Sequence, residues 1–330
     1  MSISNKQNNF DFTFPLICSE IALSLYPQLI KLIPTTLDVQ IAVRCISYSI
    51  LGIIGLFVNN ITNINQQEKK DNNNSMSLFS IIFMGCINLI HIISSYTSFK
   101  LLPSGVSYSL FYTYPIFNLL GRTIFYNEKI KLINYIYIII AIIGVYLIYN
   151  KENQGQQENK GQQENQNNPI QTQIEIFKNK NNLNEKNETN DIKQNGFIAG
   201  IISALSESLI YFMVKSDIAS ISPYTQIIKT YLFGGLLSIG YLIKNIKLIN
   251  LDINYWITLI LFNSIIGFLG YVLRFFTIPR LSTLKFNSII FIGVIFSYIW
   301  GYIFSGEQIE KTSIIGTLLI LGSIFKINYF

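Results

Sequence analysis

Residues 101–130 read LLPSGVSYSLFYTYPIFNLLGRTIFYNEKI, and residues 280–309 read RLSTLKFNSIIFIGVIFSYIWGYIFSGEQI. In both stretches a long apolar segment with a polar start runs into a short turn that carries a glutamate, Glu128 or Glu307. A closing apolar segment follows each turn, and the two stretches align without a gap. This repetition predicts that the chain consists of two related halves.

The composition places the chain in a lipid bilayer. Hydrophobic residues make up 50% of the chain and charged residues 13%, less charge than the surface of a soluble domain needs. A helix needs roughly 20 mostly apolar residues to cross the hydrocarbon, and several stretches reach that length. The fold class is therefore predicted to be an all-α membrane protein.

Hydropathy predicts ten transmembrane helices, five in each half. They cover residues 12–33, 39–58, 76–98, 105–126, 131–150, 196–215, 222–243, 253–275, 281–304 and 312–330. Because five is odd, the second half enters the membrane from the opposite side, which makes the halves inverted repeats. The predicted domains are a polar tail over residues 1–11, repeats over 12–150 and 196–330, and a linker between them.

The linker, residues 151–195, is dominated by Asn, Gln, Lys and Glu. Such a composition cannot bury enough apolar surface to order the chain, so the linker is predicted to be disordered. Basic residues gather at the loops that share a side with the termini, so both termini are predicted to be cytoplasmic. On this topology, Lys31 and Lys311 belong to the outer side. The sequence does not identify the membrane.

The remaining composition excludes several classes of function. The net charge of +6 gives no indication of nucleic-acid binding, because the basic residues are scattered and lie mostly at span ends. The cysteines Cys18, Cys45 and Cys86 lie in apolar stretches, so they are interpreted as buried small side chains. The chain contains a single histidine, His91, which cannot form a metal site alone. No metal or cofactor is expected.

Several short motifs occur in order along the chain. They are Tyr26-Pro27, Lys31, Pro34-Thr35 and Arg44 near the start, Pro115, Phe125-Tyr126-Asn127-Glu128 and Ile143-Gly144-Val145 later in the first half, and Ser305-Gly306-Glu307, Gly316 and Leu319-Ile320-Leu321-Gly322 in the second half. In this order and spacing they resemble the motifs of the EamA-like transporters of the drug/metabolite transporter superfamily. The resemblance covers nearly the whole chain outside the tail and the linker. It implies a ten-helix transporter with a central cavity, in which the fifth and tenth helices are peripheral.

Charged residues inside the spans are costly and are therefore candidates for function. Each half has an acid on its first helix, Glu20 or Glu207, and a base on its second, Arg44 or Lys229. At ~1.5 Å per residue, Glu207 and Lys229 lie at nearly the same depth, so this pair is predicted to form. The carboxylates are predicted to face the cavity and to bind a cationic group or a proton. The alternative is a structural ion pair.

Polar residues at helical spacing complete the list of cavity candidates. They are Ser24, Asn88, His91, Tyr112, Tyr211, Asn263, Tyr271 and Asn287, beside Glu20, Arg44, Glu207 and Lys229. Pro115 is predicted to kink its helix. Glu128 and Glu307 are expected to fix turns, and Arg274 is expected to extend toward the inner interface.

The leading hypothesis is a secondary transporter for a small organic metabolite that works by alternating access. The sequence contains no GxxxxGK[ST] loop, which argues against ATP-driven transport by this chain alone. Two alternatives are weighed: a membrane-embedded enzyme, disfavoured because there are few loop carboxylates and one histidine, and a non-transporting scaffold or regulator. The expected partners are the lipid bilayer and a small-molecule substrate, with no nucleic acid. The sequence leaves homodimer formation open.

Overall fold

The computed structural model describes residues 12–62, 78–126, 131–154, 193–215, 222–245, 249 and 251–329. Throughout these ranges the regular secondary structure is helical, with no strand. The tail at residues 1–11 and Glu128 lie outside the described residues. So does most of the predicted linker, although its first residues continue a helix that ends at Gln154 and its last ones begin a helix at Lys193.

The described part of the first half contains three long helices and two pairs of short ones. They are α1 (Thr13–Leu23), α2 (Tyr26–Leu32), α3 (Leu37–Thr62), α4 (Leu78–Leu101), α5 (Ser104–Phe111), α6 (Tyr114–Tyr126) and α7 (Leu132–Gln154).

The second half begins with a helix over Lys193–Lys215. It continues with α9 (Pro223–Asn245), α10 (Ile253–Leu261), the π-helix η4 (Phe262–Gly267), α11 (Phe268–Thr277), α12 (Thr283–Ile289), α13 (Phe291–Ser305) and α14 (Lys311–Tyr329).

Eight helical stretches in the described ranges are long and apolar enough to cross a membrane. The stretch formed by α5 and α6 is not among them, and each of these helices is shorter than a span. The helix α14 is not among them either. The chain is thus an integral, multi-pass membrane protein.

Proline explains two of the breaks between short helices. Proline has no amide hydrogen, and its ring clashes with the carbonyl four residues earlier. Four residues before Pro27 is Leu23, where α1 ends, and four residues before Pro115 is Phe111, where α5 ends. The predicted kink at Pro115 is therefore confirmed. The second half breaks at the matching place, Ile290, although Val294 stands where the first half has proline.

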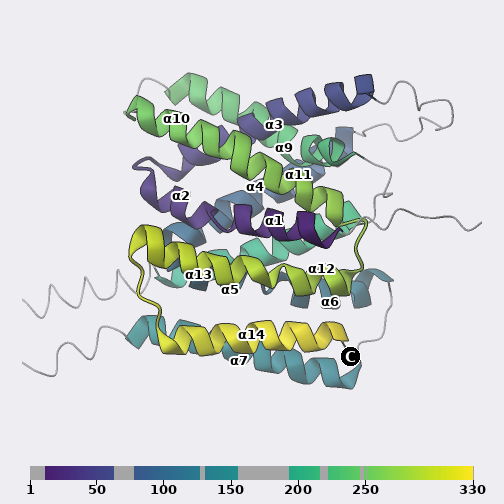
Figure 1. Cartoon of the computed structure of the whole chain (residues 1–330), viewed down its shortest axis with the longest axis vertical. Coiled ribbons are helices and arrows are strands. Elements are labelled where there is room, and N and C mark those ends of the chain that lie inside the picture. The colour runs from purple at the N-terminus through teal and green to yellow at the C-terminus, as the bar shows by residue number, and fades with distance from the viewer. Residues whose placement is uncertain are drawn as a thin grey trace, which may run out of the picture.

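The helices lie side by side across the long axis of the molecule (Figure 1). The pair α7 and α14 forms one end, and α3, α9 and α10 form the other. Between them, α1 packs on α11 and α5 packs on α13. The main core cluster lies largely in this middle part and is rich in tyrosine. On the outer faces many isoleucines are exposed, as expected of surfaces that contact lipid.

The cysteines show why an apolar span does not by itself predict burial. Cys45 is buried and Cys18 is partly buried, but Cys86 is exposed on α4. The prediction that all three are buried is therefore wrong for Cys86. A span that contacts lipid on one side exposes apolar residues there as readily as it buries them on the other.

Candidate functional site

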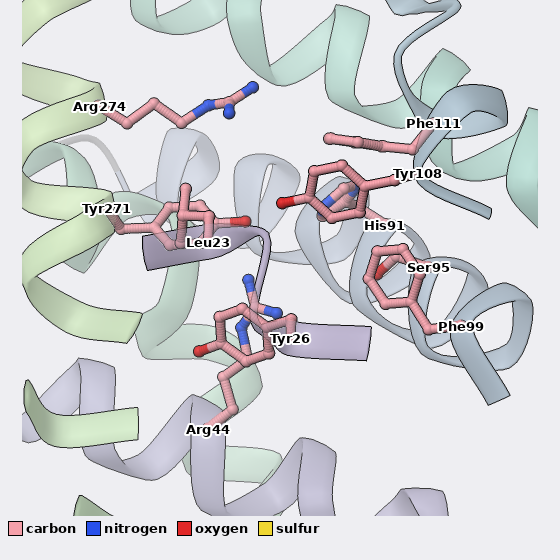
Figure 2. Close-up of a pocket in the computed structure, with 10 residues that line it drawn as sticks. All are labelled: Leu23, Tyr26, Arg44, His91, Ser95, Phe99, Tyr108, Phe111, Tyr271 and Arg274. Atoms are coloured by element: carbon pink, nitrogen blue, oxygen red, sulfur yellow. The ribbon is translucent and has the colours of Figure 1, made fainter. Parts of the chain in front are cut away.

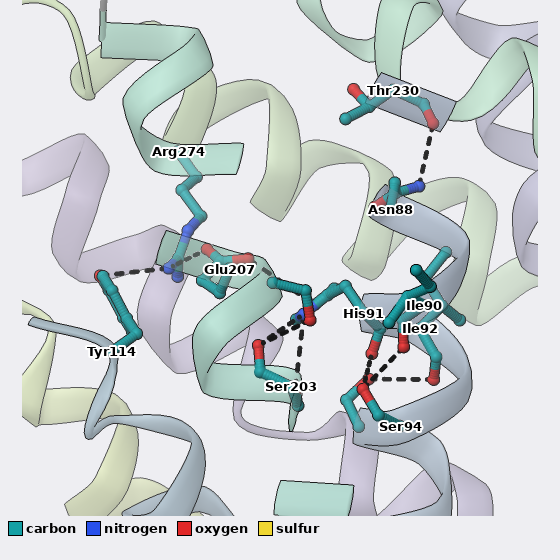
Figure 3. A network of polar contacts seen from close by, with 12 residues as sticks. Asn88, Ile90, His91, Ile92, Ser94, Tyr114, Ser203, Glu207, Thr230 and Arg274 are labelled. Atoms are coloured by element: carbon teal, nitrogen blue, oxygen red, sulfur yellow. Dashed lines mark hydrogen bonds and ion pairs between the residues drawn. The ribbon is translucent and has the colours of Figure 1, made fainter. Parts of the chain in front are cut away.

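The centre of the molecule holds a buried arginine between two glutamates. Glu20 lies on α1, Glu207 on the helix Lys193–Lys215, and Arg274 near the end of α11. Arg274 Nη1 donates to Glu20 Oε1 at 2.7 Å. Arg274 Nη2 donates to Glu207 Oε1 at 2.7 Å, as Figure 3 shows. The guanidinium thus links the first helix of one half to two helices of the other.

Other polar groups complete this cluster. The Tyr112 hydroxyl donates to Glu20 Oε2, and Arg274 Nη2 lies 3.3 Å from the Tyr114 hydroxyl. His91 Nε2 lies 3.7 Å from Glu207 Oε2, and its Nδ1 lies 3.3 Å from the Ser203 carbonyl oxygen (Figure 3). Both carboxylates therefore have several polar partners, as buried charges require.

The predicted pair of Glu207 with Lys229 is wrong. The Glu207 carboxylate contacts Arg274 and His91, and Lys229 lies partly buried on α9. Glu20 binds Arg274 as well, and not Arg44, the base of its own half. The expected position of Arg274 at the interface is also wrong, since its side chain is 2% exposed. Hydropathy gives the depth of a residue along its helix, but it does not say which helix faces it.

A second buried arginine, Arg44 on α3, has a different environment. Tyrosine rings surround it from five different helices, with centroids 4.4–5.7 Å from its Cζ. They belong to Tyr26, Tyr48, Tyr96, Tyr231 and Tyr271, which we call the tyrosine cage. Arg44 Nη2 donates to the Tyr231 hydroxyl at 2.8 Å. No carboxylate within the described ranges forms an ion pair with Arg44.

A small cavity of about 20 Å³ lies between the two arginines (Figure 2). Its lining comprises Leu23, Tyr26, Arg44, His91, Ser95, Phe99, Tyr108, Phe111, Tyr271 and Arg274. The space is narrow, and about one ordered water is the size of molecule that fits. Neither glutamate belongs to this lining, although both bind Arg274, which does. The prediction that the carboxylates face the cavity does not hold for this conformation.

Comparison with known proteins identifies the family. The model of the EamA-like transporter family matches residues 14–150 and again residues 194–329. The chain belongs to the EamA-like transporter family. No curated protein matches it in sequence. A solved crystal structure, titled only as a protein, has the same fold, with a TM-score of 0.53, 12% sequence identity and 97% of each chain covered.

Four other residues that were predicted to line the cavity make contacts between helices instead. Ser24 accepts a hydrogen bond from Trp300 Nε1 at 3.0 Å, and Asn88 Nδ2 donates to the Thr230 carbonyl at 3.0 Å. Asn263 Oδ1 accepts from the Tyr26 hydroxyl at 2.9 Å, and Tyr211 packs on Phe286. Asn287 is buried on α12 and is absent from the cavity lining. Of the predicted residues, Arg44, His91 and Tyr271 line the cavity.

A third polar cluster lies at one end of the helices and joins the two halves. Gly306 ends α13 in the left-handed conformation, with φ of 61°, and directs Glu307 back toward α5. Glu307 accepts hydrogen bonds from the Ser104 amide at 2.7 Å and the Ser104 hydroxyl at 2.8 Å, and it forms an ion pair with Lys31. The Glu307 side chain therefore caps the N-terminus of α5 in the other half, whereas its predicted role in fixing its own turn stays a prediction.

Proposed function

We propose that this protein is a secondary transporter that moves a small organic metabolite across a membrane by alternating access around the central cavity. The observation that carries the proposal is the buried charge at the middle of an apolar protein. Glu20 and Arg44 come from the first half, and Glu207 and Arg274 from the second. Ionisable groups within membrane spans are expensive, and in transporters they mark the path of the substrate.

The packing of the helices supports two inverted repeats of five spans. In this proposal the stretches of α5 with α6 and of α14 are the fourth and tenth spans. The second spans α3 and α9 pack on each other, as do the fourth spans α5 and α13 and the fifth spans α7 and α14. The third span of each half also packs on the second span of the other. Exchanging the halves leaves this pattern unchanged, as a two-fold relation requires.

The narrowness of the cavity supports alternating access. A metabolite does not fit in the space between the arginines, so the helices must separate for it to enter. With both termini cytoplasmic, the ion pair of Lys31 with Glu307 closes the outer side. In the proposed cycle this pair opens when the cavity faces outward, and rocking of the repeats about the cavity exchanges the two states.

Flux into liposomes tests the proposal. The purified protein is first screened by thermal unfolding against amino acids, nucleosides, nucleotide sugars, organic acids and polyamines, because a ligand of the folded state raises its stability. A stabilising compound is then followed in radiolabelled counterflow with wild-type protein and with Glu207→Gln. The transporter predicts counterflow in the wild type and a strong reduction in the folded variant. A folded protein that binds ligands without flux would instead indicate the scaffold or regulator.

A further inference from the structure

The tyrosine cage leaves the charge of Arg44 without a counter-ion. The side chain is 2% exposed, and among the described residues no carboxylate pairs with it. The rings offer cation–π attraction, which is worth more in a desolvated site than at a surface. That attraction acts through the ring faces and does not replace an acceptor for the guanidinium N–H groups.

Two donors of the cage have no acceptor. Arg44 Nε is buried and donates to no group in the described part of the protein, and the buried Tyr96 hydroxyl likewise lacks a hydrogen-bond partner. The Arg44 Cζ lies 5.4 Å from the Tyr96 ring centroid, so both belong to one cluster. A buried donor without a partner costs free energy, and a group that can only accept would satisfy it.

The charge along the cavity has one sign. The charged side chains in its lining are Arg44 and Arg274, and no carboxylate is among them. Arg274 is already bonded to two carboxylates, so Arg44 holds the positive charge that is not neutralised. Figure 2 shows both guanidiniums at the cavity, with aromatic side chains between and beside them.

We infer that Arg44 binds an anionic group of the transported metabolite, and that the substrate is a small organic anion with an apolar body. A guanidinium pairs well with a carboxylate or a phosphate because its N–H groups form a planar fork. Leu23, Phe99 and Phe111 line the same cavity and provide an apolar surface for the rest of the molecule. The inference rests on the proposed function, which it deepens by naming the class of substrate.

Thermal unfolding of the full-length protein in detergent tests the inference with matched probes. Benzoate and phenyl phosphate carry the two anionic groups, benzyl alcohol is the neutral match, and benzylamine is the cationic one. We expect the anions to raise the unfolding temperature of the wild type and the other two to leave it unchanged. The anion that raises the unfolding temperature more identifies whether the site prefers a carboxylate or a phosphate. Inorganic phosphate tests whether the apolar body is needed.

Variants of the cage separate binding from folding. We expect Arg44→Gln to weaken binding of the anion by on the order of tenfold or more, the size of a lost charge-assisted hydrogen bond. Arg44→Lys keeps the charge without the planar fork and should retain part of the binding, and Tyr96→Phe should weaken it severalfold. Lys100→Gln removes an exposed positive charge on α4 and should leave the shift intact.

The results distinguish this inference from the proposed function. A wild type that responds to benzylamine and not to benzoate overturns the inference, as does an unchanged benzoate response in folded Arg44→Gln. A folded wild type that responds to no anion overturns it too. Counterflow of a cation would then support a transporter with a different substrate. Binding of the anion through Arg44 without counterflow would uphold the site and reject transport.

Discussion

The two buried arginines line one cavity but have different surroundings. Arg274 donates to two carboxylates at 2.7 Å, whereas Arg44 has five tyrosine rings around it and a hydroxyl as its acceptor. Each is 2% exposed, so burial does not distinguish them. The difference lies in the groups that would be left without a partner if each arginine were removed.

Removing Arg274 would leave two buried carboxylates without their main partner, whereas removing Arg44 would leave only uncharged tyrosines. The first residue is therefore expected to hold helices of both halves together. The second is expected to contribute little to the fold, because its own burial is costly. The comparison separates a structural arginine from one that is available to a ligand.

The largest expected effect is on stability at Arg274. Arg274→Gln should lower the free energy of unfolding by roughly 3–5 kcal/mol, the loss seen when one partner of a buried ion pair is removed. Arg44→Gln should change it far less. Thermal unfolding of the detergent-solubilised protein measures both. As a control, Arg274→Gln with Glu20→Gln and Glu207→Gln should recover part of the loss, because no unpaired carboxylate remains. Equal losses for the two arginines would refute the comparison.

A smaller effect is expected when one acid is removed. Glu20→Gln or Glu207→Gln leaves Arg274 with one carboxylate, so each should cost about 1.5–3 kcal/mol, the range for a hydrogen bond to a charged group. The double variant leaves Arg274 without a carboxylate at the cavity and should bind benzoate more tightly than the wild type. Isothermal titration measures that affinity. No gain in affinity would mean that an unpaired arginine alone does not make an anion site here.

A change far from the arginines should lower stability without affecting anion binding. Gly144 on α7 approaches Gly316 on α14, and a methyl group added to Gly144 would lie 2.6 Å from the Gly316 carbonyl oxygen. Gly144→Ala should therefore cost about 1–3 kcal/mol by forcing these helices apart. It should leave anion binding unchanged, because the pair lies at the far end of the molecule (Figure 1). Gly322→Ala, in open space, is the control and should be within roughly 0.5 kcal/mol of the wild type.

The sequence predicted the helical stretches well because hydropathy and proline act locally. The break at Pro115 follows from four residues of chain, and the acids Glu20 and Glu207 are recognisable from the cost of burying charge. Their partner was missed because Arg274 lies near the end of α11. A long side chain at a helix end reaches the interface or the interior equally well, and only the neighbouring helices decide which.

The tyrosine cage could not be predicted for a related reason. Its rings come from α2, α3, α4, α9 and α11, so no spacing along the chain links them. Tyrosine is also frequent throughout the sequence, at 20 residues, and its presence in a span is a weak signal. Arg44 was identified as a charged residue, but only the folded protein shows that no carboxylate of the described residues pairs with it.

The smallest effect on stability is expected at the partly exposed end cluster, where Lys31 pairs with Glu307. Its side chains are 19% and 17% exposed, so Lys31→Gln should cost about 0.5–1 kcal/mol, much less than a change in the buried cluster.

The effect of Lys31→Gln on opening of the outer side should be larger than its effect on stability. In a background without Cys18, Cys45 and Cys86, Ser104→Cys places a buried thiol beneath the pair. Lys31→Gln should make this thiol react severalfold faster with an impermeant maleimide. Lys100→Gln should not, and equal rates would show that this pair does not hold the outer side closed.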